Sequence, residues 1–274
     1  MEAYFDIHNW MQQRLQDEVS IQSLNTIYDQ AMIRVVEKAL QEFSPPPCNF
    51  SWFVLGSGGR RELVSTSDQD HGIIFEETGH EHYFQKLGQT ISDGLFALGF
   101  AYCEGKVMSS ERQWCKSVDE WKAQISEWRA SEDLKDIRHM QMIIDARMVY
   151  GSEALENQMK DIIFPIEQKL LELLATNMSL LKKGLTPLGQ LIVDQQQRFD
   201  YKNCIYVPYV NAVRLLKLQG KPIDESLYEA VMKFRLFEHP LIKVNQENKA
   251  QLKVLTKAVK KLHNEVITHI GIRC

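Results

Sequence analysis

The sequence lacks the features of a membrane protein and of a disulfide-stabilised secreted protein. No apolar run approaches the roughly 20 residues that span a bilayer, and the first residues show no signal-peptide core. The five cysteines form no Cys-x-x-Cys pair, and their number is odd. We therefore expect a soluble protein of the reducing cytoplasm, with no membrane partner.

The sequence also lacks a strong excess of charge of one sign. Lys and Arg number 32 against 36 Asp and Glu, for a net charge of -4, which argues against nucleic acid as the main partner. No internal repeat or low-complexity tract is present. With 274 residues, 44% of them hydrophobic and 25% charged, the chain has an ordinary globular composition and is long enough for two domains.

The stretch 52–77 combines two apolar runs with a glycine-rich turn between them. The runs are Trp-Phe-Val-Leu at 52–55 and Ile-Ile-Phe at 73–75, and the turn is Gly-Ser-Gly-Gly at 56–59. Short apolar runs bounded by glycine and polar residues are typical of buried strands. This stretch is therefore predicted to form a strand, a tight turn and a second strand.

Asp68 and Asp70, just before the second apolar run, are the candidate metal ligands. On a strand, residues two apart project to the same side, roughly 6.5 Å apart along the chain. Such a carboxylate pair suits Mg²⁺, which binds through one or two carboxylates plus substrate phosphates. The glycines upstream let backbone amides line an anion-binding concavity, so we expect a phosphate site beside the metal.

This stretch resembles the nucleotidyltransferase superfamily typified by DNA polymerase beta, whose signature is Gly-Ser, a short spacer and Asp-x-Asp at a strand. The resemblance is closer to the nucleotidyltransferase family often found fused to CBS domains, and to the uridylyltransferases that modify PII proteins. The matching residues are Gly56, Ser57, Gly59, Arg60, Glu62, Asp68, Gln69 and Asp70, with Cys103, Gly105 and Met108 downstream.

The resemblance implies transfer of a nucleoside monophosphate from a nucleoside triphosphate to an acceptor hydroxyl, with release of pyrophosphate. Asp68 and Asp70 would be catalytic and would hold Mg²⁺ or Mn²⁺. The nucleotide-binding residues would be Gly56, Ser57, Gly59 and Arg60. Two candidates for a third metal-binding acid stay open, Glu104 and Asp145. Glu62 is expected to bond the turn that carries Ser57, and His71 to be a rim residue.

Residues 200–214 resemble the helical domain that follows the transferase domain in the same family and is thought to hold the acceptor. Lys202 and Arg214 occupy the matching lysine and arginine positions. They are candidates for contacts with a protein or small-molecule acceptor, and equally for a pair on a helix surface.

The periodicity of apolar residues predicts helices over residues 1–43, 80–98 and throughout 152–274. A third strand is expected at 100–108, and tryptophans seven apart, at 114, 121 and 128, predict a helical core cluster. The expected fold is α+β: N-terminal helices (1–44), a small mixed-sheet nucleotidyltransferase domain (45–151) and an all-helical, substrate-binding domain (152–274).

Two functions from different classes are open. The first is a metal-dependent nucleotidyltransferase, similar to uridylyl- or adenylyltransferases that act on signalling proteins, or acting on a small molecule. The second is a non-catalytic module that binds a nucleotide to regulate a partner. The intact Gly56, Ser57, Asp68 and Asp70 favour the enzyme, because nucleotide binding alone does not require two carboxylates in register.

Overall fold

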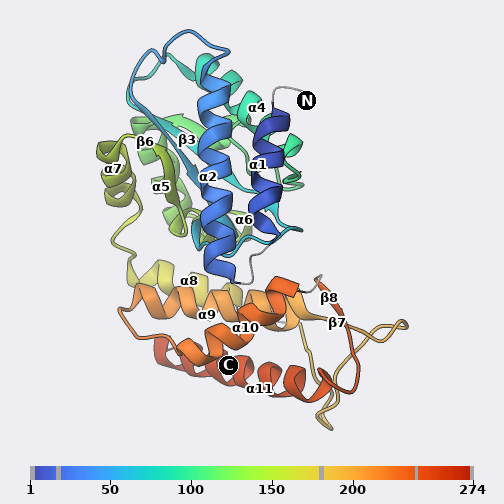
Figure 1. Cartoon of the computed structure of the whole chain (residues 1–274). Helices are drawn as coiled ribbons and strands as arrows, with labels where there is room; N and C mark the ends of the chain where they lie inside the picture. Colours follow the sequence, from blue (N-terminus) through green and yellow to red (C-terminus); the bar gives the residue numbers. More distant parts are fainter. Residues whose placement is uncertain (1–3, 17–19, 179–181, 238–239, 272–274) are drawn as a thin grey trace. The chain divides into compact units, whose positions relative to one another are not determined.

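The computed structural model describes residues 4–16, 20–178, 182–237 and 240–271. Contacts divide the chain into two compact units, Met1–Pro165 and Ile166–Cys274, and many of their elements are labelled in Figure 1. The chain forms a small mixed sheet, and helices precede and follow the sheet in the sequence, which confirms the predicted α+β class. Within the described ranges, no helix combines the length and the apolar character needed to cross a bilayer.

The first unit begins with two helices, α1 (Phe5–Leu15) and α2 (Ile21–Leu40), which pack against each other. The Ser20 hydroxyl caps α2 by accepting a hydrogen bond from the Ser23 amide at 3.1 Å. Buried side chains on α2 join one hydrophobic cluster with the sheet and with α4 (Glu81–Ala97). The predicted N-terminal helix pair is therefore confirmed, and so is the helix predicted at 80–98.

The main sheet has four strands in the order β5-β3-β1-β6. The central strands, β1 (Phe50–Val54) and β3 (His71–Phe75), are antiparallel and buried along their whole length. Strand β6 (Arg147–Gly151) pairs antiparallel with β1, and β5 (Cys115–Ser117) pairs parallel with β3. Burial on both faces explains why the two predicted strands appear as continuous apolar runs.

Helices cover both faces of this sheet. Helices α2 and α4 pack on the face that carries Trp52. Helix α5 (Val118–Ala130) packs on the other face, where the ring centroids of Phe53 and Trp121 are 5.8 Å apart. Two more helices, α6 (Leu134–Ile144) and α7 (Glu153–Ile163), complete the first unit.

The third strand predicted at 100–108 is mostly wrong. Only Ala101–Tyr102 forms a strand, β4, and it pairs parallel with β2 (Asp68–Gln69) outside the main sheet. The chain then turns, because the Lys106 amide donates to the Cys103 carbonyl at 3.0 Å while Lys106 takes a φ of 56°. The strand that extends the main sheet on this side is β5.

The tryptophan cluster is buried as predicted, but its helix is shorter. Trp114 closes a 3-10 turn, Arg112–Trp114, ahead of β5. Helix α5 begins after Ser117, which forms a capping box with Glu120. Trp121 and Trp128 therefore lie on one helix and Trp114 on the preceding turn, all three in contact.

The second unit is mostly helical, but residues 182–197 contain no helix, so the prediction of helices throughout 152–274 is wrong for that segment. Its helices are α8 (Gln168–Met178), α9 (Val207–Leu218), α10 (Glu225–Phe237) and α11 (Lys249–Ile270), with a π-helical turn at Lys202–Tyr206. Strands β7 (Arg198–Asp200) and β8 (Leu241–Lys243) form an antiparallel pair that the helical pattern did not indicate. The predicted domain boundaries at 44 and 151 concern functional domains and stay a prediction. The division by contacts falls after Pro165, so it places α7 in the first unit.

Candidate active site

Asp68 and Asp70 lie on one side of the strand segment that runs from β2 into β3. Asp68 is exposed and Asp70 half-buried, whereas Gln69 and His71, which alternate with them, are buried. This alternation is the one expected of an extended chain. Both carboxylates therefore face a common space, as the sequence predicts.

His71 is not a rim residue, and this prediction is wrong. Its Nδ1 accepts from the Trp52 indole N–H at 3.3 Å and from the Ser109 amide at 3.1 Å, so its Nε2–H donates to Gln69 Oε1 at 2.9 Å. Gln69 in turn donates to the carbonyls of Ser92 and Phe100. Burial lowers the pKa of His71 to about 3, so the imidazole is neutral and holds the acidic segment on the core.

Cys103 joins the two aspartates and was not among the predicted site residues. One ligand atom from each of Asp68, Asp70 and Cys103 lies within 4.8 Å of the other two. Burial, then the charge of the Asp70 carboxylate and the hydrogen bond that the thiol donates to it, raise the pKa of Cys103 to about 12. No sequence spacing signals this neighbour, because it comes from the turn after β4.

The glycine-rich turn forms a one-turn helix, α3 (Gly56–Gly59), against Asp70. Gly56 has a φ of 50°, and a Cβ there would lie 3.3 Å from Asp70 Oδ2. The Leu55 amide donates to the Asp70 carbonyl at 2.9 Å. Turn and acidic segment are thereby fixed to each other by backbone contacts.

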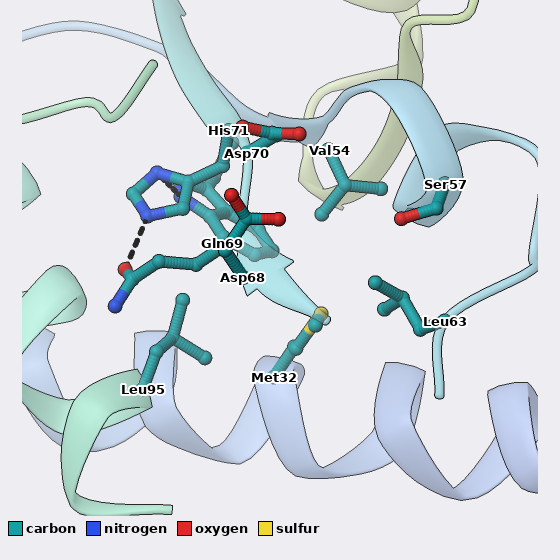
Figure 2. A pocket seen from close by; sticks show the side chains of 11 residues that line it. Met32, Val54, Ser57, Leu63, Asp68, Gln69, Asp70, His71 and Leu95 are labelled. Carbon is teal, nitrogen blue, oxygen red and sulfur yellow. Dashed lines mark hydrogen bonds between the residues drawn. The ribbon is translucent and has the colours of Figure 1, made fainter. Parts of the chain in front are cut away.

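Ser57, Asp68 and Asp70 line one small pocket, shown in Figure 2, of about 250 Å³ including its open mouth. Met32 and Leu95, from α2 and α4, supply part of its apolar wall. Two carboxylates and a hydroxyl around one space suit a metal ion and phosphate oxygens.

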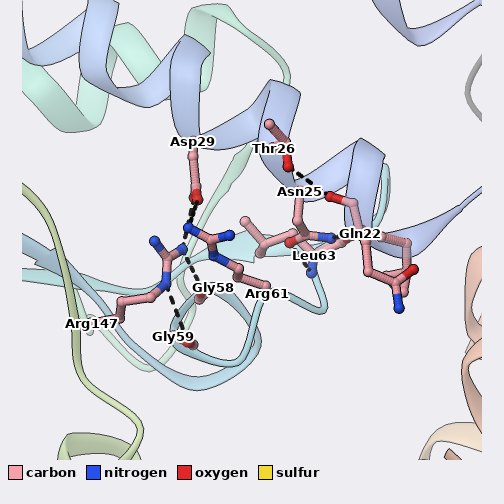
Figure 3. Close-up of polar contacts among 10 residues, drawn as sticks. Gln22, Asn25, Thr26, Asp29, Gly58, Gly59, Arg61, Leu63 and Arg147 are labelled. Atoms are coloured by element: carbon pink, nitrogen blue, oxygen red, sulfur yellow. Dashed lines mark hydrogen bonds and ion pairs between the residues drawn. The ribbon is translucent and has the colours of Figure 1, made fainter.

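Helix α2 and strand β6 anchor the turn, as Figure 3 shows. Arg147 donates to the carbonyls of Gly58 (2.9 Å) and Gly59 (3.3 Å) and to Asp29 on α2 at 2.7 Å. Arg61 also pairs with Asp29, at 3.3 Å. These contacts involve the carbonyls of the turn and not its amides. The first backbone N–H groups of a helix have no carbonyl partner within the helix, so those of α3 are the groups able to bind an anion.

Arg60 is engaged within the protein. Its guanidinium donates to Glu62 Oε2 at 2.8 Å and forms a short ion pair with Asp145. Gly59 lies so close to Asp145 that a Cβ there would sit 1.8 Å from the Asp145 carbonyl oxygen. Arg60 thus ties the turn to the end of α6, and Glu62 bonds this turn as predicted.

Neither predicted third acid joins the aspartate pair. Asp145 pairs with Arg60, and Glu104 is exposed on the turn after β4. Among the residues that the structure describes, the convergent group of metal-binding side chains is Asp68, Asp70 and Cys103.

The predicted acceptor-binding residues, Lys202 and Arg214, lie in the second unit. Lys202 is exposed on the π-helical turn. Arg214 is buried on α9 and donates to Asn211 Oδ1 at 2.6 Å. Lys202 and Arg214 therefore do not form a pair on a helix surface.

Comparison with known proteins supports the assignment of this region. Residues 6–135 match the model of a family described as "Putative nucleotidyltransferase DUF294", which confirms the resemblance carried by the Gly-Ser and Asp-Gln-Asp motifs. The match includes Ser57, Asp68, Asp70 and Cys103 and ends before the second unit. It supports an enzyme of nucleotidyl transfer in general, with a nucleoside triphosphate as substrate. A search of curated proteins finds no match.

Proposed function

We propose that this protein, whose residues 6–135 carry the nucleotidyltransferase-family segment, is a metal-dependent nucleotidyltransferase centred on Asp68 and Asp70. It would transfer a nucleoside monophosphate from a triphosphate to an acceptor hydroxyl and release pyrophosphate. The observation that carries the proposal is that Ser57, Asp68 and Asp70 line one pocket.

In this proposal each element has one task. Asp68 and Asp70 would hold Mg²⁺ or Mn²⁺, which when bound supplies charge stabilisation for phosphate oxygens. The Ser57 hydroxyl and the amides of Gly56 to Gly59 would bind the terminal phosphates, leaving the α-phosphorus open to the acceptor. Arg60 would act indirectly, by fixing this turn to Asp145 and Glu62.

The resemblance to PII uridylyltransferases extends the proposal to the acceptor. Lys202 and Arg214 would belong to the part of the chain that binds a protein or small-molecule acceptor, and the reaction would be uridylyl or adenylyl transfer in the cytoplasm. The exposure of Lys202 supports a direct contact. The burial of Arg214 supports a role in holding α9.

A second candidate is the non-catalytic nucleotide sensor. It is favoured by one observation: neither Glu104 nor Asp145 completes a three-carboxylate centre. A site with two carboxylates still binds a metal–triphosphate complex, since Mg²⁺ needs only one or two protein carboxylates. The two candidates therefore differ in turnover and not in binding.

The test replaces the acids one at a time. Asp68→Asn and Asp70→Asn should each abolish transfer of an α-phosphate-labelled nucleotide to acceptors in a cell extract, because each removes a metal ligand. Thermal stability without metal should stay unchanged or rise, since one of two like charges is lost. Asp161→Asn, at an exposed acid on α7, is the control and should keep wild-type transfer.

The outcomes separate three cases. Transfer lost only in the two site variants supports the enzyme. Metal-dependent nucleotide binding with no transfer by the wild type favours the sensor. Loss of folding in both site variants would make the aspartate pair structural and contradict both functions.

A further inference from the structure

We infer that Cys103 is a third ligand of the metal held by Asp68 and Asp70, and that it gives the site a preference for thiophilic divalent cations such as Zn²⁺ and Co²⁺ over Mg²⁺. The inference deepens the proposed function and rests on it for the two aspartates. It adds a residue that selects the metal.

The geometry places the sulfur among the carboxylates. The parallel pairing of β2 with β4 sets Asp68 opposite Ala101 and Gln69 opposite Tyr102. Asp70 and Cys103 are the next residues of these two segments. The sulfur and one oxygen from each aspartate lie within 4.8 Å of one another. Three ligand atoms at this spacing can bind a single ion after small side-chain movements.

The thiol is held at this place by its surroundings. Cys103 is buried and begins the tight turn that the Lys106 amide closes. Just after this turn, the Val107 carbonyl accepts a hydrogen bond from the His71 amide at 3.0 Å. The turn that carries Cys103 is thus bonded to the acidic segment on both sides of the site.

Ligand chemistry then decides which ion gains from the sulfur. Mg²⁺ takes oxygen ligands and keeps several waters, so a sulfur adds little to its binding. Soft thiolate ligands favour ions such as Zn²⁺, and a zinc site with three protein ligands keeps a position open for substrate. When such an ion binds, the S–H bond breaks, the metal–sulfur bond forms, and the proton leaves to water.

Co²⁺ alone, added to the full-length protein without nucleotide, tests the inference. Wild type should develop a sulfur-to-cobalt charge-transfer band in the near ultraviolet that saturates at one ion per chain. Cys103→Ser, which keeps a hydroxyl able to donate to Asp70, should lose this band. Cys48→Ser, at a half-buried cysteine outside the cluster, is the control and should keep it.

Calorimetry measures the selectivity itself. Cys103→Ser should weaken Zn²⁺ binding by about tenfold or more, the scale seen for changes around metal ligands, while Mg²⁺ affinity stays within about twofold. X-ray absorption of the wild-type cobalt protein should show one sulfur neighbour, which needs no variant to fold. A cobalt shell of oxygen and nitrogen alone, a band that persists in Cys103→Ser, or an equal loss of Zn²⁺ and Mg²⁺ affinity would each overturn the inference.

These outcomes are separable from those of the proposed function. A sulfur-bound cobalt in a protein that transfers no nucleotide would support this inference and count against the enzyme. Transfer that depends on Mg²⁺, with no sulfur bound to cobalt, would support the enzyme and contradict this inference.

Discussion

At the scale of single residues, Ser57 is the side chain expected to bind phosphate. Its hydroxyl lines the pocket with Asp68 and Asp70. Ser57→Ala should weaken binding of the metal–triphosphate complex by about 0.5 to 3 kcal/mol, the range that spans neutral hydrogen bonds and those to charged groups. Ser65→Ala removes an exposed hydroxyl nearby in the chain and should leave the affinity unchanged. If wild type, Ser57→Ala and Ser65→Ala bind the complex with equal affinity in a calorimetric titration, Ser57 does not bind phosphate.

His71 should matter for stability and not as a ligand. His71→Leu leaves the Trp52 indole N–H, the Ser109 backbone N–H and the Gln69 side-chain Oε1 without their imidazole partner. A buried polar group that loses its partner costs about 1 to 3 kcal/mol. Chemical denaturation should therefore show a loss of about 2 kcal/mol or more, against little change for His82→Leu at an exposed position. A loss below about 1 kcal/mol would contradict the network.

At the scale of elements, helix α2 is expected to fix the glycine-rich turn. Asn25 accepts from the Leu63 amide at 2.8 Å and donates to the Leu63 carbonyl at 3.0 Å. Asn25→Ala should lower the free energy of unfolding by about 2 kcal/mol or more, because both groups are buried, and should weaken nucleotide binding as well. Thr26→Ala, next on the helix with an exposed side chain, is the control.

The nucleotide measurement separates anchoring from mere stability. If Asn25→Ala lowers stability but leaves triphosphate affinity at the wild-type value well below its melting temperature, α2 supports the fold without positioning the turn.

The sequence predicted the elements whose pattern is local. Strands β1 and β3 contain the short apolar runs at 52–54 and 73–75, and α4 has an apolar face formed by Phe84, Leu87, Ile91 and Leu95. Strand β5, only Cys115–Ser117, is too short to show an alternation. The error at 100–108 arose because the prediction ran one strand through Glu104, Gly105 and Lys106, although a glycine between charged residues is itself a turn signal. Local pattern does not encode which segment a short strand pairs with.

The site was predictable only as far as its motif reaches. Asp68, Asp70 and the glycine-rich turn are adjacent in sequence, and the structure brings them together. Arg60 and Asp145 are separated by 85 positions, so the sequence around either residue does not predict their ion pair. The sequence placed Arg60 among the nucleotide-binding residues. His71 looked like a rim residue because the partners that bury it lie on β1 and beyond β4.

At the scale of the whole molecule, nucleotide and acceptor are expected to be bound by different parts of the chain. Lys202→Ala should leave affinity for the metal–triphosphate complex within about twofold of wild type and lower kcat/KM for the true acceptor, because contacts with the acceptor appear only in that second measurement. Lys217→Ala, at an exposed lysine on α9, should change neither.

Arg214→Ala is a poorer probe of the same division, because Arg214 is buried and bonded to Asn211. Its effect on activity has meaning only beside a melting curve. If Lys202→Ala weakens nucleotide binding as much as Ser57→Ala does, the expected division of roles is wrong.

The central claim, a metal-dependent triphosphate site at Asp68 and Asp70, is tested most directly by calorimetric titration of a nucleoside triphosphate into the protein, once with Mg²⁺ or Mn²⁺ and once with a chelator. Two carboxylates without a cation repel the triphosphate. The account predicts saturable binding with metal and none in the chelator, and no binding by the Asp68→Asn, Asp70→Asn double variant under either condition. Equal affinity with and without the chelator would contradict it.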